Sequence, residues 1–146
     1  MALLNIVKVP NDLLHKASKP VLKFDENLWT LLDDMEETMR TARGIGLAAV
    51  QVGYLLRACL VELEDGEVLE LINPQVLSTK GKKRKGTEGC LSIPGVAIRV
   101  ERFRNIRIRF QDRHGNWQEC NLEEISAICA QHEIDHLDGK LITDWE

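Results

Sequence analysis

The chain has 146 residues, 44% of them hydrophobic and 29% charged, and a net charge of −4. This length suffices for one buried core and is too short for two ordinary domains, so we expect a single domain over residues 1–146. The composition is typical of a soluble globular protein. The negative charge argues against a protein whose main function is to bind nucleic acid.

The N-terminal segment and the cysteines indicate the compartment. The first twenty residues lack the long apolar core of a signal peptide and the Arg- and Ser-rich, acid-poor composition of a transit peptide. No apolar run approaches the length of a membrane span. We therefore expect a cytoplasmic protein, in which Cys59, Cys90, Cys120 and Cys129 are thiols or metal ligands rather than disulfides.

The first predicted elements are helical. Asn11 to Lys16 is predicted to form one short helical turn. From Glu26 to Arg43, leucines and methionines recur at steps of three and four residues, which predicts an amphipathic helix ending before Gly44. The following segment "GIGLAAVQ" (44–51) matches the weak G-x-G-x-x-A dinucleotide fingerprint. Because that fingerprint must follow a strand and this segment follows a helix, we exclude a nucleotide site.

The middle of the chain has the pattern of antiparallel strands. The segments Leu56–Glu64 and Glu67–Leu77 flank an Asp65-Gly66 turn, which predicts a hairpin. The segments "GVAIRVERF" (95–103) and "NIRIRFQD" (105–112) alternate apolar and polar residues, and "WQECNL" (117–122) follows a turn. Between them, the basic run "KGKKRKG" (80–86) and the segment "TEGCLSIPG" (87–95) are predicted to be loops. A solvated loop is the default interpretation of the basic run, and contact with ribosomal RNA is the alternative.

A second helix is predicted from about Leu122 to Leu137, with Asn121 as its cap and Glu124 completing a capping box. Helix, strands and helix in this order predict an α+β fold, with antiparallel or mixed sheets packed around this last helix.

The last helix carries the metal-binding pattern His-Glu-x-x-His at residues 132–136. Two histidines four residues apart also occur by chance. Here, however, His132 and His136 continue the apolar face of the helix, where burying two imidazoles without a partner would be costly. The pattern therefore favours a metal site.

The third ligand is expected upstream of the helix. The extended protease pattern requires a histidine where this chain has Ile142, and a downstream glutamate would need more chain than the nine residues after Leu137. The upstream candidates are His15, His114, the four cysteines and several carboxylates. Among them, Cys90 is distinctive because Gly89 and the rigid Pro94-Gly95 bracket its loop.

Three segments together resemble peptide deformylase: "GIGLAAVQ" (44–51), "EGCLS" (88–92) and "QHEIDH" (131–136). The resemblance implies that Cys90, His132 and His136 bind the metal, with water in the fourth position. It also implies that Glu133 moves the proton of that water, while the Gln51 amide and the Leu91 N–H stabilise the oxygen of the formyl group. The implied activity is removal of the formyl group from N-formylmethionyl peptides, with release of formate.

The resemblance further implies Fe²⁺ as the metal, with Zn²⁺, Ni²⁺ or Co²⁺ able to replace it; the His₂Cys ligand set alone suggests zinc. Gly44 and Gly46 would let the substrate backbone approach. Glu88 would support the loop or the metal site. The candidates for a methionine pocket are Ile45, Ile125, Ile128 and Cys129.

The chain departs from the family in two places. Ala97 replaces an arginine that many bacterial members carry, which makes Arg99 and Arg102 candidates for contacts with the substrate backbone. The family's usual C-terminal helix, associated with ribosome docking, has no counterpart before Glu146, so we expect any ribosome association to be weakened. We also expect a monomer. The rival hypotheses are a metalloprotease and a binding module with a structural metal, whose site would be closed by a fourth protein ligand.

Overall fold

The structure is a computed structural model that describes residues 2–145. Within them lie two α-helices, α1 (Glu26–Thr41) and α2 (Glu124–Leu137), and three short 3₁₀ helices, Asp12–His15, Ala49–Val52 and Ile142–Trp145. The strands are β1 (Gly46–Ala48), β2 (Ala58–Glu62), β3 (Val68–Thr79), β4 (Arg84–Cys90), β5 (Ile93–Arg102), β6 (Asn105–Gln111) and β7 (Trp117–Glu123). No helix in this range is long and apolar enough to cross a membrane.

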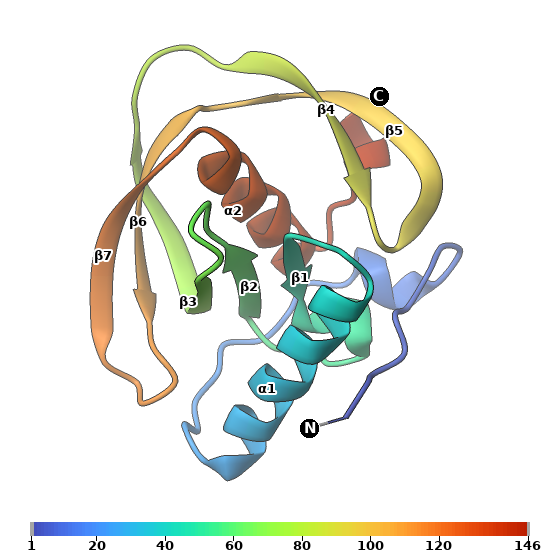
Figure 1. Ribbon diagram of the computed structural model, residues 1–146, viewed down its shortest axis with the longest axis vertical. Coiled ribbons are helices and arrows are strands. Elements are labelled where there is room, and N and C mark those ends of the chain that lie inside the picture. The colour runs from blue at the N-terminus through green and yellow to red at the C-terminus, as the bar shows by residue number, and fades with distance from the viewer. Residues whose placement is uncertain (1, 146) are drawn as a thin grey trace.

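The strands form two antiparallel sheets, which confirms the predicted α+β class (Figure 1). The larger sheet has the order β1-β2-β3-β6-β7, and β4 pairs only with β5. In Figure 1, α2 occupies the middle of the molecule, with the β4–β5 pair passing over it. The helix that carries the histidines is therefore enclosed by strands from both sheets.

Strand β2 separates two hydrophobic clusters. Its residues Cys59 and Val61 pack with α2, whereas Ala58 and Leu60 pack with the leucines and methionines of α1. Alternate residues of a strand face opposite sides of a sheet, so α1 and α2 cover opposite faces of this strand. Burial on both faces explains its uninterrupted apolar sequence.

Helix α1 begins where the sequence predicts and ends two residues earlier, at Thr41. The side chain of Asp25 caps its first turn by accepting a hydrogen bond from Leu28 N. At the other end, Arg43 adopts a positive φ of 58° and Gly44 N donates to Met39 O. This left-handed residue closes the last turn of the helix.

The loop predicted for residues 80–95 is partly wrong. Residues 84–90 form β4, which pairs with β5 from Arg84↔Arg102 to Cys90↔Ile93. Residues 81–85 are exposed. Because backbone pairing with β5 holds β4, this strand needs no alternating apolar face, and its two glycines and charged residues give it no strand-like pattern.

The predicted cap of α2 is also wrong. Strand β7 continues to Glu123, and the side chain of Asn121 accepts a hydrogen bond from Arg107 Nη1 at 3.0 Å instead of capping the helix. Glu123 precedes α2 without a side-chain cap, and Glu124 has a φ of 50°. Pairing with β6 therefore delays the start of α2, which then turns sharply out of the strand.

Candidate active site

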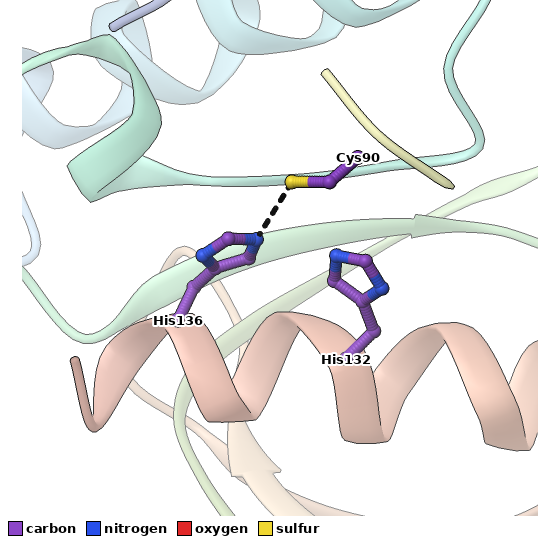
Figure 2. A group of neighbouring side chains, drawn as sticks. All are labelled: Cys90, His132 and His136. Atoms are coloured by element: carbon purple, nitrogen blue, oxygen red, sulfur yellow. Dashed lines mark hydrogen bonds between the residues drawn. The ribbon is translucent and has the colours of Figure 1, made fainter. Parts of the chain in front are cut away.

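The end of β4 brings Cys90 to the two histidines of α2. His132 and His136 lie one turn apart and rise from the same side of the helix toward the thiol (Figure 2). The Cys90 Sγ to His136 Nε2 distance is 3.4 Å, and the three potential ligand atoms lie within 4.8 Å of one another. Both imidazoles are buried, and Cys90 is half-buried.

This arrangement fits a tetrahedral metal ion. Bond lengths of about 2.3 Å to sulfur and about 2.05 Å to nitrogen would place the two ligand atoms about 3.6 Å apart. The 3.4 Å between Cys90 and His136 is close to that separation. His132 uses Nδ1 to contact Glu88, which leaves its Nε2 for a metal. With three protein ligands, a four-coordinate ion keeps one position for water or substrate.

The two histidines have opposite pKa shifts. Burial, followed by the positive charges of His132 and Arg102, lowers the pKa of His136 to about 3, so its ring is neutral and offers a lone pair. Burial also acts to lower the pKa of His132. There, the charge of Glu133 and the contacts with Cys90 and Glu88 outweigh it and raise the pKa to about 10 in the metal-free chain.

Glu133 is a buried carboxyl group between the candidate metal ligands and the sheet. Burial raises its pKa to about 7, even though His132 and Arg102 act in the opposite direction. Its Oε1 is buried without a hydrogen-bond partner among residues 2–145. A carboxyl group that titrates near neutral pH can both accept and donate a proton.

Glu88 joins His132, one of the candidate metal ligands, to a buried ion pair. Its carboxylate contacts His132 Nδ1 at 3.1 Å and accepts hydrogen bonds from Arg102 Nε and Nη2 at 3.0 and 3.1 Å. Arg102 also donates to Asp135. Burial would raise the pKa of Glu88, but His132 and Arg102 together hold it below its ordinary value. Such a partner fixes the tautomer and orientation of a metal-binding imidazole.

Arg102 is therefore not the substrate contact that the sequence suggested. It is only 4% exposed, and its guanidinium is occupied by Glu88 and Asp135. Arg99 is exposed, but it does not line the cavity beside the ligands.

Gln51 lies beside the ligands in the 3₁₀ helix that follows β1 and is 2% exposed. Its Oε1 accepts a hydrogen bond from Ala48 N at 2.9 Å. Its Nε2 donates to Ser92 Oγ at 3.1 Å and lies 3.7 Å from Cys90 Sγ. The amide nitrogen is thus directed toward the ligand group.

A cavity of about 750 Å³ opens beside the ligands. Several of the residues that the sequence singled out line it: Gly44, Ile45, Gly46, Gln51, Glu88, Cys90, Leu91, Ile125, Ile128, Cys129, His132 and Glu133. Ile45 and Ile125 are about half exposed because they face this open space. Its mixture of apolar walls and a few polar groups is typical of a small-ligand site.

Gly46 makes one wall of this site. A Cβ atom on Gly46 would lie 2.4 Å from Glu133 Oε2 and 2.5 Å from Cys129 Sγ. The strand can therefore approach the carboxylate this closely only with glycine at this position.

The chain resembles proteins of one known family over nearly its whole length. The family model described as polypeptide deformylase matches residues 3–145. The chain belongs to the polypeptide deformylase family. The peptide deformylase of Alkalilimnicola ehrlichii is 48% identical over 99% of this chain and 83% of its own length.

Solved deformylase structures have the same fold. The Thermotoga maritima enzyme superposes with a TM-score of 0.96 at 37% identity, covering 99% of this chain and 98% of the other. The Ehrlichia chaffeensis enzyme, solved in complex with actinonin, has a TM-score of 0.96 at 37% identity, covering 100% and 90%. This deformylase is accordingly a hydrolase that removes the formyl group from N-formylmethionyl nascent peptides, in a family that depends on a metal.

The sequence of this deformylase does not indicate the place of two polar residues in the site, and it suggests a different role for a third. Ser92 and Asp135 lie inside the family motifs but carry no spacing signal of their own, and Arg102 was assigned to the substrate. Their roles depend on which side chains face them across the fold. Two other upstream candidates lie outside the ligand group: Cys59 is buried in β2, and His114 lies in an exposed turn with its ring 5.4 Å from that of Trp29. Cys129 lines the cavity but is not part of the ligand group.

Proposed function

We propose that this deformylase uses Cys90, His132 and His136 to hold a divalent metal and Glu133 to move the proton in formyl hydrolysis. The supporting observation is the grouping of these three ligand atoms within 4.8 Å, beside a buried carboxyl group and an apolar cavity. We propose Fe²⁺ as the native ion, with Zn²⁺, Ni²⁺ or Co²⁺ as replacements. When bound, the metal supplies a Lewis acid that polarises the formyl carbonyl and makes a water molecule more acidic.

Glu133 is the base and then the acid. Its unpartnered Oε1 takes a proton from the attacking water and delivers it to the leaving amine of methionine. A pKa of about 7 suits both directions, because the group is then neither a strong acid nor a strong base at neutral pH.

Gln51 Nε2 and the Leu91 N–H stabilise the negative charge that develops on the formyl oxygen. Support for this role comes from the position of the Gln51 amide, 3.7 Å from the Cys90 thiol, and from Leu91 lining the cavity directly after Cys90. Donors of this kind each typically contribute on the order of a hundredfold or more in rate.

The substrate backbone pairs with the segment that leads into β1, and its methionine side chain occupies the apolar part of the cavity. Strand β1 is at an edge of the large sheet, so its outer backbone groups can accept an added strand. Ile45, Ile125, Ile128 and Cys129 supply the walls for the methionine side chain. We place the enzyme in the cytoplasm as a single-domain monomer.

Formate release from formyl-Met-Ala-Ser tests the proposal. The protein is loaded anaerobically with Fe²⁺ or Ni²⁺ and compared with Glu133→Ala and Cys90→Ala. We expect metal-dependent release that falls by at least a factor of about 10³ in Glu133→Ala and is lost in Cys90→Ala. Full activity in either folded variant would refute its assigned role, and a folded, metal-loaded wild type without activity would refute the proposed mechanism.

A further inference from the structure

Ser92 presents a buried hydroxyl to the side chain of Gln51. Ser92 is 0% exposed, and its backbone carbonyl accepts a hydrogen bond from Val9 N at 2.9 Å. Its Oγ accepts a hydrogen bond from Gln51 Nε2 at 3.1 Å. One hydrogen bond therefore fixes the backbone of Ser92, and the other fixes its hydroxyl group.

The orientation of the Gln51 amide matters because its two ends are chemically opposite. The nitrogen carries two N–H donors, whereas the oxygen is only an acceptor. The bond from Ala48 N restrains the oxygen, but a single hydrogen bond tolerates some rotation of the amide plane about the bond to its carbon chain. The bond to Ser92 at the other end removes that freedom and uses one N–H, which leaves the second N–H on the side of Cys90.

We propose that Ser92 is a positioning residue that holds the Gln51 amide so that its second N–H meets the formyl oxygen. This inference rests on the oxyanion role proposed above for Gln51. Two residues after Cys90 would then serve the formyl oxygen: the Leu91 N–H donates to it directly, and Ser92 acts through Gln51.

Kinetics of Ser92→Ala test the inference. A donor that is free to turn away loses part of its contribution, so kcat should fall by about 10- to 100-fold while KM changes little. In a Gln51→Ala background the same substitution should change kcat by less than about twofold, because no amide remains to be positioned. Ser18→Ala is the matched control: Ser18 is 7% exposed, and its hydroxyl is buried without a hydrogen-bond partner among residues 2–145.

An NMR measurement tests, independently of turnover, whether Ser92 orients the Gln51 amide. The side-chain amide protons of Gln51, assigned by their absence in Gln51→Ala, should show one protected proton in the zinc-loaded wild type and none in Ser92→Ala. Ser92→Cys, which nearly preserves the volume, should give intermediate protection and retain the fold if Ser92→Ala does not.

The outcomes are separable. Unchanged kcat in Ser92→Ala, or an equal loss in the Gln51→Ala background, would overturn the inference and leave the proposed function standing. If the wild type releases no formate, the proposed function fails, and unaltered Gln51 amide protons in Ser92→Ala would then reject the positioning role as well.

A different observation concerns Arg43, at the mouth of the cavity. Its φ of 58° is a conformation that glycine adopts more easily than arginine, and helices commonly end with glycine at this position. Its guanidinium makes no hydrogen bond or ion pair with residues 2–145, although it lines the cavity next to Gly44 and Ile45. A cation is thus retained at a strained position where the fold gives it no partner.

The path of the substrate leads toward this cation. Glu133 packs against Gly46, so the reacting carbon lies near Gly46 and the chain from Gly46 back to Arg43 leads away from it. At about 3.3 Å per residue, the third residue of an extended peptide lies about 10 Å from the reacting carbon. Arg43 lines the same cavity in that direction, so its long side chain can reach this residue.

We infer that Arg43 gives the enzyme a preference for an acidic side chain at the third residue of the formyl peptide. The inference again rests on the proposed function. With formyl-Met-Ala-Glu, formyl-Met-Ala-Gln and formyl-Met-Ala-Lys, kcat/KM should decrease in this order, by about two- to fivefold at each step in low salt. Added salt should reduce the differences, because exposed charges are screened.

Charge substitutions provide the decisive comparison. Arg43→Gln should remove the order, Arg43→Glu should reverse it, and Arg43→Lys should retain it. Arg84→Gln is the control, since it removes the same charge from an arginine that does not line the cavity and makes no ion pair within residues 2–145, and it should keep the order. Equal rates for the three peptides in the wild type would overturn the inference, whereas no turnover of the neutral peptide would instead refute the proposed function.

Discussion

At the scale of single residues, the site depends on buried polar groups that each serve two partners. Glu88 contacts the ring of His132 and forms a two-pronged ion pair with Arg102, which also reaches Asp135. Removing one member of such a network leaves the remaining charges buried without compensation. The cost of a substitution here is therefore set by the charges left behind.

Arg102→Met should destabilise the fold by about 3 kcal/mol or more, because Glu88 and Asp135 lose their shared cation. The affinity for zinc should fall by about 10- to 100-fold, since the ring of His132 is held less firmly. Urea unfolding and competition with a chelator measure the two effects. Arg107→Met, in an exposed pair with Glu119, should cost less than about 1 kcal/mol, and an equal loss in both variants would contradict the argument.

Gly46→Ala should lower both activity and stability. The added methyl group would lie 2.4 Å from Glu133 Oε2, so either the carboxylate or the strand must move, at a cost of about 1–3 kcal/mol. Formate release and urea unfolding are the measurements. Gly89→Ala is the control for stability, because a Cβ atom there would lie 3.9 Å from its nearest neighbour and the φ of Gly89 is not positive. A wild-type kcat in Gly46→Ala would show that catalysis does not require the carboxylate in its present position.

At the scale of elements, two helix termini show how pairing and backbone conformation set the boundaries. Strand β7 continues to Glu123 because it pairs with β6, and only then does α2 begin. Helix α1 ends because Arg43 turns into the left-handed region, although the apolar pattern itself imposes no such stop. Neither boundary follows from periodicity alone.

Arg43→Gly should stabilise the fold by about 0.5–1 kcal/mol, because glycine adopts a positive φ without steric cost. Ala42→Gly, one residue earlier, should have the opposite sign and cost about 0.5–1 kcal/mol, since Ala42 has helical angles. Urea unfolding of the two variants tests the pair. The same sign for both would show that backbone conformation does not govern this helix end.

At the scale of the whole molecule, the candidate metal group joins parts of the fold that are otherwise held by separate sheets. Cys90 ends β4 in the two-stranded sheet, whereas the histidines belong to the helix packed on the larger one. A metal bound to all three would therefore favour the folded chain, in which alone they meet.

Zinc at one hundred times its dissociation constant should raise the free energy of unfolding by about 2.7 kcal/mol, and a chelator should abolish the gain. Cys90→Ala should lose most of this gain because one of the three ligands is missing. Cys120→Ala, which removes a half-buried thiol of β7, should keep it. Urea unfolding with and without zinc provides the test, and a full gain in Cys90→Ala would exclude that thiol as a ligand.

Local pattern is enough to predict a large part of this protein. The steps of three and four residues in α1, the Asp65-Gly66 hairpin and the spacing of His132 and His136 are visible in the chain, because each reflects contacts between near neighbours. The three family motifs add the activity and the expected ligands. Such features can be predicted from the sequence because contacts between residues close in the chain determine them.

Other features depend on residues that meet only after folding. The partner of Glu88 is Arg102, the partner of Gln51 is Ser92, and β4 exists through its pairing with β5. Each of these contacts joins segments with no common periodicity, and burial decides whether an arginine is free for substrate or bound to a carboxylate. The tertiary structure therefore determined the partners of these residues, since the free energy of a buried polar group depends on the group that faces it.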